Sequence, residues 1–252
     1  MSDSEQANGA LAIIGGTGLT SLDGLHITRK EMVHTPWGEP SGPITHGTLN
    51  GVQVAFLARH GYHHTIPPHE VNYRANMHAL KEVGIKQVVA VAAVGGIAPN
   101  LLSASLVITD QIIDYTWGRG HTFFEGKLDQ VEHIDFTFPY DEPLRQALIE
   151  AASRARLDFT AGATYGVTQG PRLESAAEID RMERDGCDVV GMTGMPEAAL
   201  ARELGLAYAH CTVIANPAAG RGDGAITMQQ IRKQLERGME QVKLLLGEFV
   251  AS

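Results

Sequence analysis

The sequence contains little cysteine. Only two of its 252 residues are cysteines, Cys187 and Cys211, and both lie in apolar runs without a C-x-x-C pair. This scarcity argues against a disulfide framework, and we expect both thiols to be buried and free in a reducing compartment.

Positive charge is also scarce. The chain has 20 Lys and Arg residues against 29 Asp and Glu residues, which gives a net charge of −9. Proteins that bind the nucleic-acid backbone need a basic face, so we expect no nucleic-acid partner. Any anion site must come from a local concentration of donor groups, because the overall charge does not attract anions.

Long hydrophobic runs are missing. No apolar stretch reaches the roughly 18 residues of a membrane-spanning helix, and the chain opens on the polar, acidic stretch MSDSEQANGA. We therefore expect no membrane span, no signal peptide and a cytoplasmic protein. A hydrophobic content of 44% with 19% charged residues suits a globular protein with a full core.

Short apolar runs alternate with amphipathic stretches along the chain. The predicted strands cover residues 11–15, 52–58, 87–94, 106–113, 163–168, 187–192 and 207–215. The predicted helices cover about 69–83, 143–156, 174–185 and 196–204, followed by a C-terminal helix with apolar positions Met228, Ile231, Leu235, Val242, Leu246 and Phe249. This order predicts an α/β fold with a central mixed, mostly parallel sheet flanked by helices. We expect a polar N-terminal tail over residues 1–9 and one domain over 10–252.

The first predicted strand ends in a glycine-rich turn within the stretch LAIIGGTGL. A dinucleotide-binding turn needs G-x-G-x-x-G and a following helix, but Ser21 stands at the last glycine position, and Gly18 and Gly24 interrupt the next residues. Backbone N–H groups and the Thr17 hydroxyl remain, and such turns bind phosphate or sulfate. A plain strand-end turn is the alternative.

The second long strand is followed by RHGYHHTIPPHEVNYRAN, which holds four histidines: His60, His63, His64 and His69. A metal site is disfavoured, because glycine and prolines interrupt the segment and no H-E-x-x-H or cysteine accompanies it. Arg59 and His60 at the strand end instead suit an anion, as a cation beside a hydrogen-bond donor.

Other predicted strands also end in polar or small residues. Gly95-Gly96 permits close approach of a flat ligand or of a packed helix. Glu174 either favours a helix N-terminus or accepts from a ligand N–H. Thr193 precedes a helix, and the Asn216 amide suits a ring nitrogen beside a carbonyl, with a simple Asn-Pro turn as the alternative. In α/β sheets, ligands bind at the carboxyl ends of strands.

These segments resemble the trimeric purine nucleoside phosphorylase and methylthioadenosine phosphorylase family. The matching stretches are IIGGTGL, LARHG…HTIPPHEVNYRAN, GPRLESAAE and GMTGMPEAALARELGL, and the match runs from about residue 11 to the final helix. The sequence is most similar to the bacterial branch that cleaves 5′-methylthioinosine. The resemblance implies phosphorolysis, which yields hypoxanthine and 5-methylthioribose 1-phosphate, with phosphate as co-substrate and no metal or organic cofactor.

The resemblance also assigns the phosphate site. It implies phosphate contacts from Thr17, Arg59, His60 and Thr193, with the backbone around Ala93. It places Met192 beneath the sugar and His64 near the phosphate–ribose side. The family usually has a hydroxyl or amide side chain where this chain has Ala92, so one donor to phosphate is missing.

For the base, the family comparison implies that Glu174, beside Leu173, accepts from the ring N–H and that Asn216 contacts the departing purine. Adenine-cleaving relatives carry aspartates at the positions of Asn216 and Ala218. Together these residues favour a 6-oxopurine such as hypoxanthine. Asn216, Arg59 and His60 are the predicted catalytic residues.

For the other end of the sugar, the resemblance places Met228 where relatives that accept ordinary nucleosides carry a histidine. Met228 and Ile231 either favour an apolar 5′-methylthio group or belong only to the helix core. His133 matches a segment that reaches the neighbouring subunit's site, which implies a homotrimer with a shared active site.

The sequence leaves three alternative functions open. The first is another substrate of the same class, either inosine and guanosine or methylthioadenosine. The second is a non-catalytic nucleotide- or anion-binding module, which Ala92 favours. The third is a dinucleotide-dependent oxidoreductase.

Overall fold

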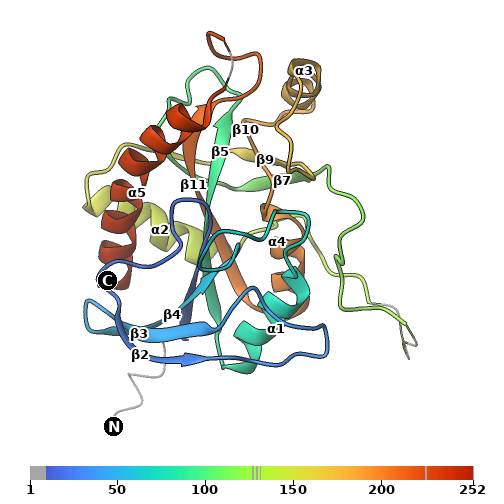
Figure 1. Cartoon of the computed structure of the whole chain (residues 1–252), viewed down its shortest axis with the longest axis vertical. Helices are drawn as coiled ribbons and strands as arrows, with labels where there is room; N and C mark the ends of the chain where they lie inside the picture. Colours follow the sequence, from blue (N-terminus) through green and yellow to red (C-terminus); the bar gives the residue numbers. More distant parts are fainter. Residues whose placement is uncertain (1–9, 127, 129, 131, 225, 252) are drawn as a thin grey trace.

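A twisted sheet of mainly parallel strands runs through the molecule, with helices on both faces (Figure 1). The computed structural model describes residues 10–126, 128, 130, 132–224 and 226–251; the predicted tail, residues 1–9, lies outside the described residues. Within them the sheet has 11 strands: β1 (Leu11–Gly15), β2 (His26–Glu31), β3 (Ile44–Leu49), β4 (Val52–Ala58), β5 (Gln87–Gly96), β6 (Leu106–Ile108), β7 (Gln111–Asp114), β8 (Phe159–Ala161), β9 (Thr164–Val167), β10 (Val189–Gly191) and β11 (Ala207–Pro217).

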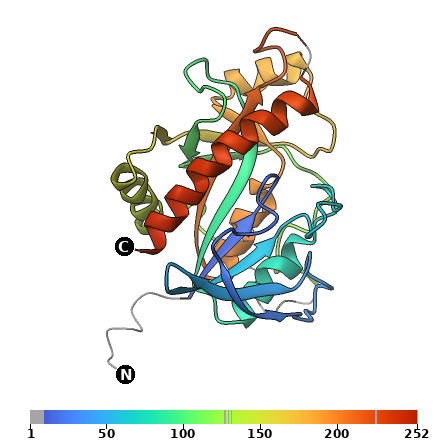
Figure 2. The same ribbon diagram turned by 60° about the vertical axis from the view of Figure 1, so that its left-hand side comes forward.

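The helices divide between the two faces of the sheet. They are α1 (Tyr73–Glu82), α2 (Glu142–Arg154), α3 (Ala176–Arg184), α4 (Gly194–Glu203) and α5 (Met228–Val250). α2 and α5 pack together on one face, where α5 runs the length of the sheet (Figure 2), and α1 and α4 pack on the other. Neighbouring strand residues serve opposite faces: Ile13 packs with the α2–α5 side and Ile14 with the α1–α4 side.

The centre of the sheet is parallel. β1 lies between β4 and β5, and β11 pairs with β5, all in parallel. The end of β5 turns to pair antiparallel with β10, and β2, β3 and β6 also join in antiparallel fashion. The predicted fold class, a mixed and mostly parallel α/β sheet flanked by helices, is confirmed.

Two predictions about strands were wrong. The predicted strand over 106–113 divides into β6 and β7, which pair with different neighbours. The break falls where the Asp110 carboxylate accepts from the Ala163 N–H at 2.8 Å. The strands β2, β3 and β8 were missed; β2 is exposed on both faces and therefore has no apolar alternation.

Helix starts also differ from the prediction. α1 begins at Tyr73 rather than near residue 69, because the Asn72 side chain caps it by accepting from the Ala75 N–H at 3.1 Å. α3 begins after Ser175, which forms a capping box with Glu178. No helix follows β1, since the next element is β2, so the crossover helix of a dinucleotide fold is missing there. None of the helices in the described ranges is both long and apolar enough to cross a membrane.

Candidate active site

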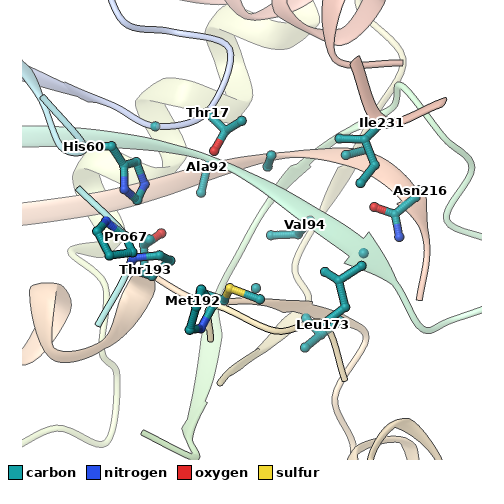
Figure 3. A pocket seen from close by; sticks show the side chains of 18 of the residues that line it. Thr17, His60, Pro67, Ala92, Val94, Leu173, Met192, Thr193, Asn216 and Ile231 are labelled. Atoms are coloured by element: carbon teal, nitrogen blue, oxygen red, sulfur yellow. The ribbon is translucent and has the colours of Figure 1, made fainter. Parts of the chain in front are cut away.

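The ends of β1, β4, β5, β10 and β11 meet around one cavity of ≈ 380 Å³ (Figure 3). The loop that follows β4 and the first turns of α5 complete its wall. The predicted site residues found on its lining are Thr17, Arg59, His60, His64, Ala92, Ala93, Leu173, Glu174, Met192, Thr193, Asn216, Ala218, Met228 and Ile231. His133 is exposed and does not lie on this lining. The cavity therefore lies at the strand ends where the sequence predicts a ligand, while the role of each residue stays a prediction.

Arg59 lies at the floor of the cavity and is 0% exposed. Its Nε and Nη2 donate to the two carboxylate oxygens of Glu197 at 2.7 and 2.8 Å, and its Nη1 donates to the Val91 carbonyl at 2.9 Å. Burial acts to lower the Arg59 pKa, but the Glu197 carboxylate more than offsets it, so the pKa is raised overall. A guanidinium has five N–H groups, and these three bonds leave two for a ligand.

Gly16 makes room for this arrangement. A Cβ on Gly16 would stand 2.8 Å from Arg59 Nη1 and 2.7 Å from the Val91 carbonyl oxygen. Any side chain at this position would push the guanidinium out of place. The glycine of the LAIIGGTGL turn therefore serves a buried arginine as well as the turn itself.

Glu197 was not predicted as a functional residue. It lies on the buried face of α4, is 0% exposed, and also accepts from the Tyr208 hydroxyl at 2.8 Å. A glutamate inside the apolar run GMPEAAL was the available sign, because buried carboxylates are rare unless paired. Its partner Arg59 lies far away in sequence, so the pairing itself was not readable.

His60 and His64 lie together beside the cavity, with ring centroids 4.7 Å apart. His60 Nδ1 lies 2.8 Å from the Ile66 carbonyl oxygen. Burial first, and then the charge of Arg59, lower the pKa of His60 to about 4, and burial lowers the pKa of His64. Both lowered pKa values favour the neutral rings at pH 7.

Two hydroxyls face the same end of the cavity (Figure 3). Thr17 Oγ1 lies 3.4 Å from His64 Nε2. Thr193 Oγ1 is buried and has no hydrogen-bond partner among the described residues, although Thr193 stands at the N-terminus of α4. An orphaned buried hydroxyl costs about 1–3 kcal/mol unless a ligand or water satisfies it.

The opposite end of the cavity carries Glu174 and Asn216. Thr168 Oγ1 donates to Glu174 Oε1 at 2.6 Å, which leaves the second carboxylate oxygen for a ligand. The Asn216 amide nitrogen donates to the Pro217 carbonyl at 2.6 Å, so this bond orients the amide. A register shift between Ile214 and Asn216 in β11 turns the strand just before Asn216, as bulges near active sites often do. The second amide N–H and the amide oxygen remain for a ligand.

A third wall of the cavity is apolar. Met228 is 59% exposed and Ile231 is 9% exposed, and both line the cavity from the first turn of α5. Met228 is therefore not a core residue, whereas Ile231 belongs to both the core and the wall. Thr227 fixes this turn, because its side chain accepts from the Gln230 N–H in a capping box.

Arg119 is a second buried arginine that the sequence analysis missed. It donates to the carbonyls of Met192 at 2.9 Å and Met195 at 2.6 Å, and to those of Thr168 at 3.2 Å and Gln169 at 2.9 Å. These bonds tie the ends of β9 and β10 together beneath the cavity. Nothing around Arg119 in the sequence indicates this role, because these four carbonyls, like its side-chain acceptors Gln169 Oε1 and the Tyr73 hydroxyl, belong to distant segments.

No group of three or more His, Cys, Asp or Glu side chains is placed to hold a metal ion in the part of the chain that the structure describes. The described cysteines, Cys187 and Cys211, are both free and buried. A reaction without metal or organic cofactor stays a prediction.

The model of the phosphorylase superfamily matches residues 10–251. This chain belongs to the phosphorylase superfamily. The resemblance identified in the sequence is thereby confirmed.

Individual relatives of this phosphorylase cover nearly its full length. A probable S-methyl-5′-thioinosine phosphorylase of Pseudomonas syringae pv. tomato is 52% identical over 96% of this chain and 98% of its own. The 6-oxopurine nucleoside phosphorylase of Pyrococcus furiosus is 44% identical over 94% of this chain and 91% of its own. The solved methylthioadenosine phosphorylase of Schistosoma mansoni in complex with adenine matches with a TM-score of 0.92 and 32% identity, over 96% of this chain and 91% of that one.

Proposed function

We propose that this phosphorylase cleaves 5′-methylthioinosine with inorganic phosphate, yielding hypoxanthine and 5-methylthioribose 1-phosphate. This makes it a pentosyltransferase of purine and methylthio-nucleoside salvage, as the names of several relatives at 52–54% identity also suggest. The observation that carries the proposal is one cavity with three different walls. A donor-rich end suits phosphate, a Glu174–Asn216 end suits a 6-oxopurine, and an apolar wall at Met228 and Ile231 suits a methylthio group.

Phosphate binds at the donor-rich end. Thr193 Oγ1, otherwise orphaned, and Thr17 Oγ1 donate to its oxygens, and the two remaining N–H groups of Arg59 supply further donors. Backbone N–H groups near Ala93 add to them, and Ala92 contributes no side-chain donor. Met192 lies beneath the sugar, and His64 lies at the phosphate–ribose side.

Catalysis is a displacement at the anomeric carbon. The bond from this carbon to the purine nitrogen breaks with its electron pair leaving on the base, while a phosphate oxygen forms the new bond from the opposite face. In net, the proton that phosphate carries ends on a ring nitrogen of the departing base. The sugar carries positive charge in between, and the bound phosphate stabilises that charge. Asn216 stabilises the departing purine, and Glu174 accepts from its ring N–H. Fixed positioning accounts for most of the rate increase.

The substrate preference follows from the polar groups at the base. A carboxylate at Glu174 needs a ring N–H, which a 6-oxopurine has and a 6-aminopurine lacks. A site built to bond such a group rejects the analogue without it, because the buried partner stays unpaired. Ala218, buried at 2% exposure, offers no second carboxylate for an amino group.

We further propose a homotrimer in which His133 reaches the neighbouring subunit's cavity, with no nucleic-acid partner and no cofactor. His133 is exposed, and two large apolar side chains of the same segment, Trp117 and Phe138, are 72% and 71% exposed. Contact with a second copy removes such surface from water. Two buried free thiols agree with a cytoplasmic location.

The test is release of hypoxanthine from 5′-methylthioinosine with and without phosphate, followed by ³¹P NMR of the sugar product. The proposal expects base release only with phosphate and one new phosphate-ester resonance. Release without phosphate would make the protein a hydrolase. Binding of the nucleoside without any release would make it a non-catalytic binding module.

A further inference from the structure

His60 holds one ring nitrogen against the backbone. Its Nδ1 lies 2.8 Å from the Ile66 carbonyl oxygen, and a carbonyl only accepts, so Nδ1 carries a proton. The Thr65 and Ile66 N–H groups both donate back to the His60 carbonyl at 3.1 Å. These bonds fix the loop, the ring orientation and the position of the ring proton.

The charged groups around this ring decide the state of Nε2. Arg59 faces the ring from the end of β4, and His64 packs against it from the same loop. Burial and the Arg59 charge act against a second proton, and the pKa of His60 is lowered to about 4. At neutral pH, Nε2 therefore carries a lone pair and no hydrogen. In the described part of the chain, nothing donates to it.

This acceptor lies among donors. His60 lines the cavity with Thr17 and Thr193, whose hydroxyls can donate (Figure 3). Arg59, which can only donate, also lines it. We infer that His60 selects a protonated oxyanion: Nε2 accepts a hydrogen bond from the P–OH of phosphate and so disfavours sulfate. The inference rests on the proposed use of phosphate and adds the basis of its selection.

Phosphate and sulfate differ in whether they carry a proton at neutral pH. Phosphate and sulfate are tetrahedral and similar in size, but phosphate keeps at least one proton at neutral pH and sulfate keeps none. A sulfate oxygen opposite Nε2 sets one acceptor against another, and a buried acceptor left unpaired costs about 1–3 kcal/mol. We expect sulfate to bind about tenfold to 100-fold more weakly than phosphate. Arsenate, which also keeps a proton, should bind like phosphate.

Titration calorimetry with phosphate, arsenate and sulfate tests this on the wild-type protein, on His60→Ala and on His60→Gln. We expect the ratio of sulfate to phosphate dissociation constants to fall about tenfold or more in His60→Ala, which has no acceptor there, and to fall less in His60→Gln, whose amide oxygen can still accept. The matched control is Thr193→Val, which removes a donor to both anions and should weaken both while leaving the ratio unchanged. If His60 variants weaken both anions in parallel, the residue is only structural and the inference fails.

A measurement without substitution covers the case of a variant that does not fold. In ¹⁵N NMR of wild-type protein, His60 should remain the neutral tautomer with its proton on Nδ1 when phosphate is added. Protonation of both nitrogens on phosphate binding would overturn the inference, as would a wild-type sulfate-to-phosphate ratio near one. If the ratio depends on His60 but no base is released from nucleoside, the anion selection stands and the proposed function fails.

Discussion

Glu197→Gln tests whether a buried ion pair positions the phosphate site. Arg59 and Glu197 are both 0% exposed and share two bonds of 2.7 and 2.8 Å. Glutamine has the same shape but loses the charge, and its NH₂ group faces an arginine N–H across one of the two bonds. The Arg59 charge then stays buried without compensation. Breaking such a pair costs about 3–5 kcal/mol of stability. Because glutamine keeps one acceptor oxygen for Arg59, we expect a cost at the lower end of this range, about 3 kcal/mol.

That loss is a large share of a typical total stability of about 5–15 kcal/mol. For a chain of this size it corresponds to a melting temperature lowered by roughly 6–12 °C. Because Arg59 would also lose its fixed orientation, the KM for phosphate should rise more than the KM for nucleoside. Urea unfolding followed by tryptophan fluorescence measures the first effect, and initial rates at varied phosphate measure the second.

Tyr208→Phe is the matched control, since it removes only the hydroxyl that donates to Glu197 at 2.8 Å and keeps the ion pair. Its cost should stay near the value for one hydrogen bond to a charged group, about 1.5–3 kcal/mol or less. The reasoning is refuted if Glu197→Gln unfolds within about 0.5 kcal/mol of wild type, the scatter of a neutral surface change, and keeps its phosphate KM.

Three further predictions concern the base, the 5′ end and acid stability. Asn216→Asp should move the ratio of kcat/KM toward 6-aminopurine nucleosides, because a carboxylate accepts from an exocyclic amine; an unchanged ratio would remove Asn216 from the base site. Met228→His should raise kcat/KM for inosine relative to 5′-methylthioinosine by offering a donor to the 5′-hydroxyl. An unaltered preference would show that Met228, although exposed, does not contact the 5′ group. His210 is fully buried among tyrosine rings, and burial holds its pKa well below 6.5. The unfolded chain gains a proton at His210 below about pH 6.5 and the folded chain does not, so acid favours unfolding. His210→Phe should therefore reduce the loss of unfolding free energy between pH 7 and pH 5 by about 2 kcal/mol; an equal loss in both proteins would contradict this.

The central strands were predictable because their residues are apolar on both faces. β1, β4, β5 and β11 were found within two residues of their ends, whereas β2 was missed because its side chains are exposed. The break between β6 and β7 depends on a carboxylate–backbone bond from Asp110 to a residue 53 positions away. Sequence periodicity cannot contain that information.

The site, too, was predictable only in part. The sequence places Thr17, Arg59 and Asn216 close together, because each follows or ends a parallel strand and parallel strands end at one edge of the sheet. The partners of charged groups could not be read, since Glu197 is 138 residues from Arg59. The ring state of His60 also required the structure, because it depends on which nitrogen meets the Ile66 carbonyl.

The most direct test of the central claim is a comparison of kcat/KM for 5′-methylthioinosine, inosine and 5′-methylthioadenosine at saturating phosphate. The three substrates differ only at the base or at the 5′ end. In the proposal, Glu174 and Asn216 contact the base, and Met228 and Ile231 contact the 5′ group. The account predicts that 5′-methylthioinosine gives the highest value. Equal values for inosine would contradict the role of the apolar wall, and a higher value for 5′-methylthioadenosine would contradict the assignment of the base site.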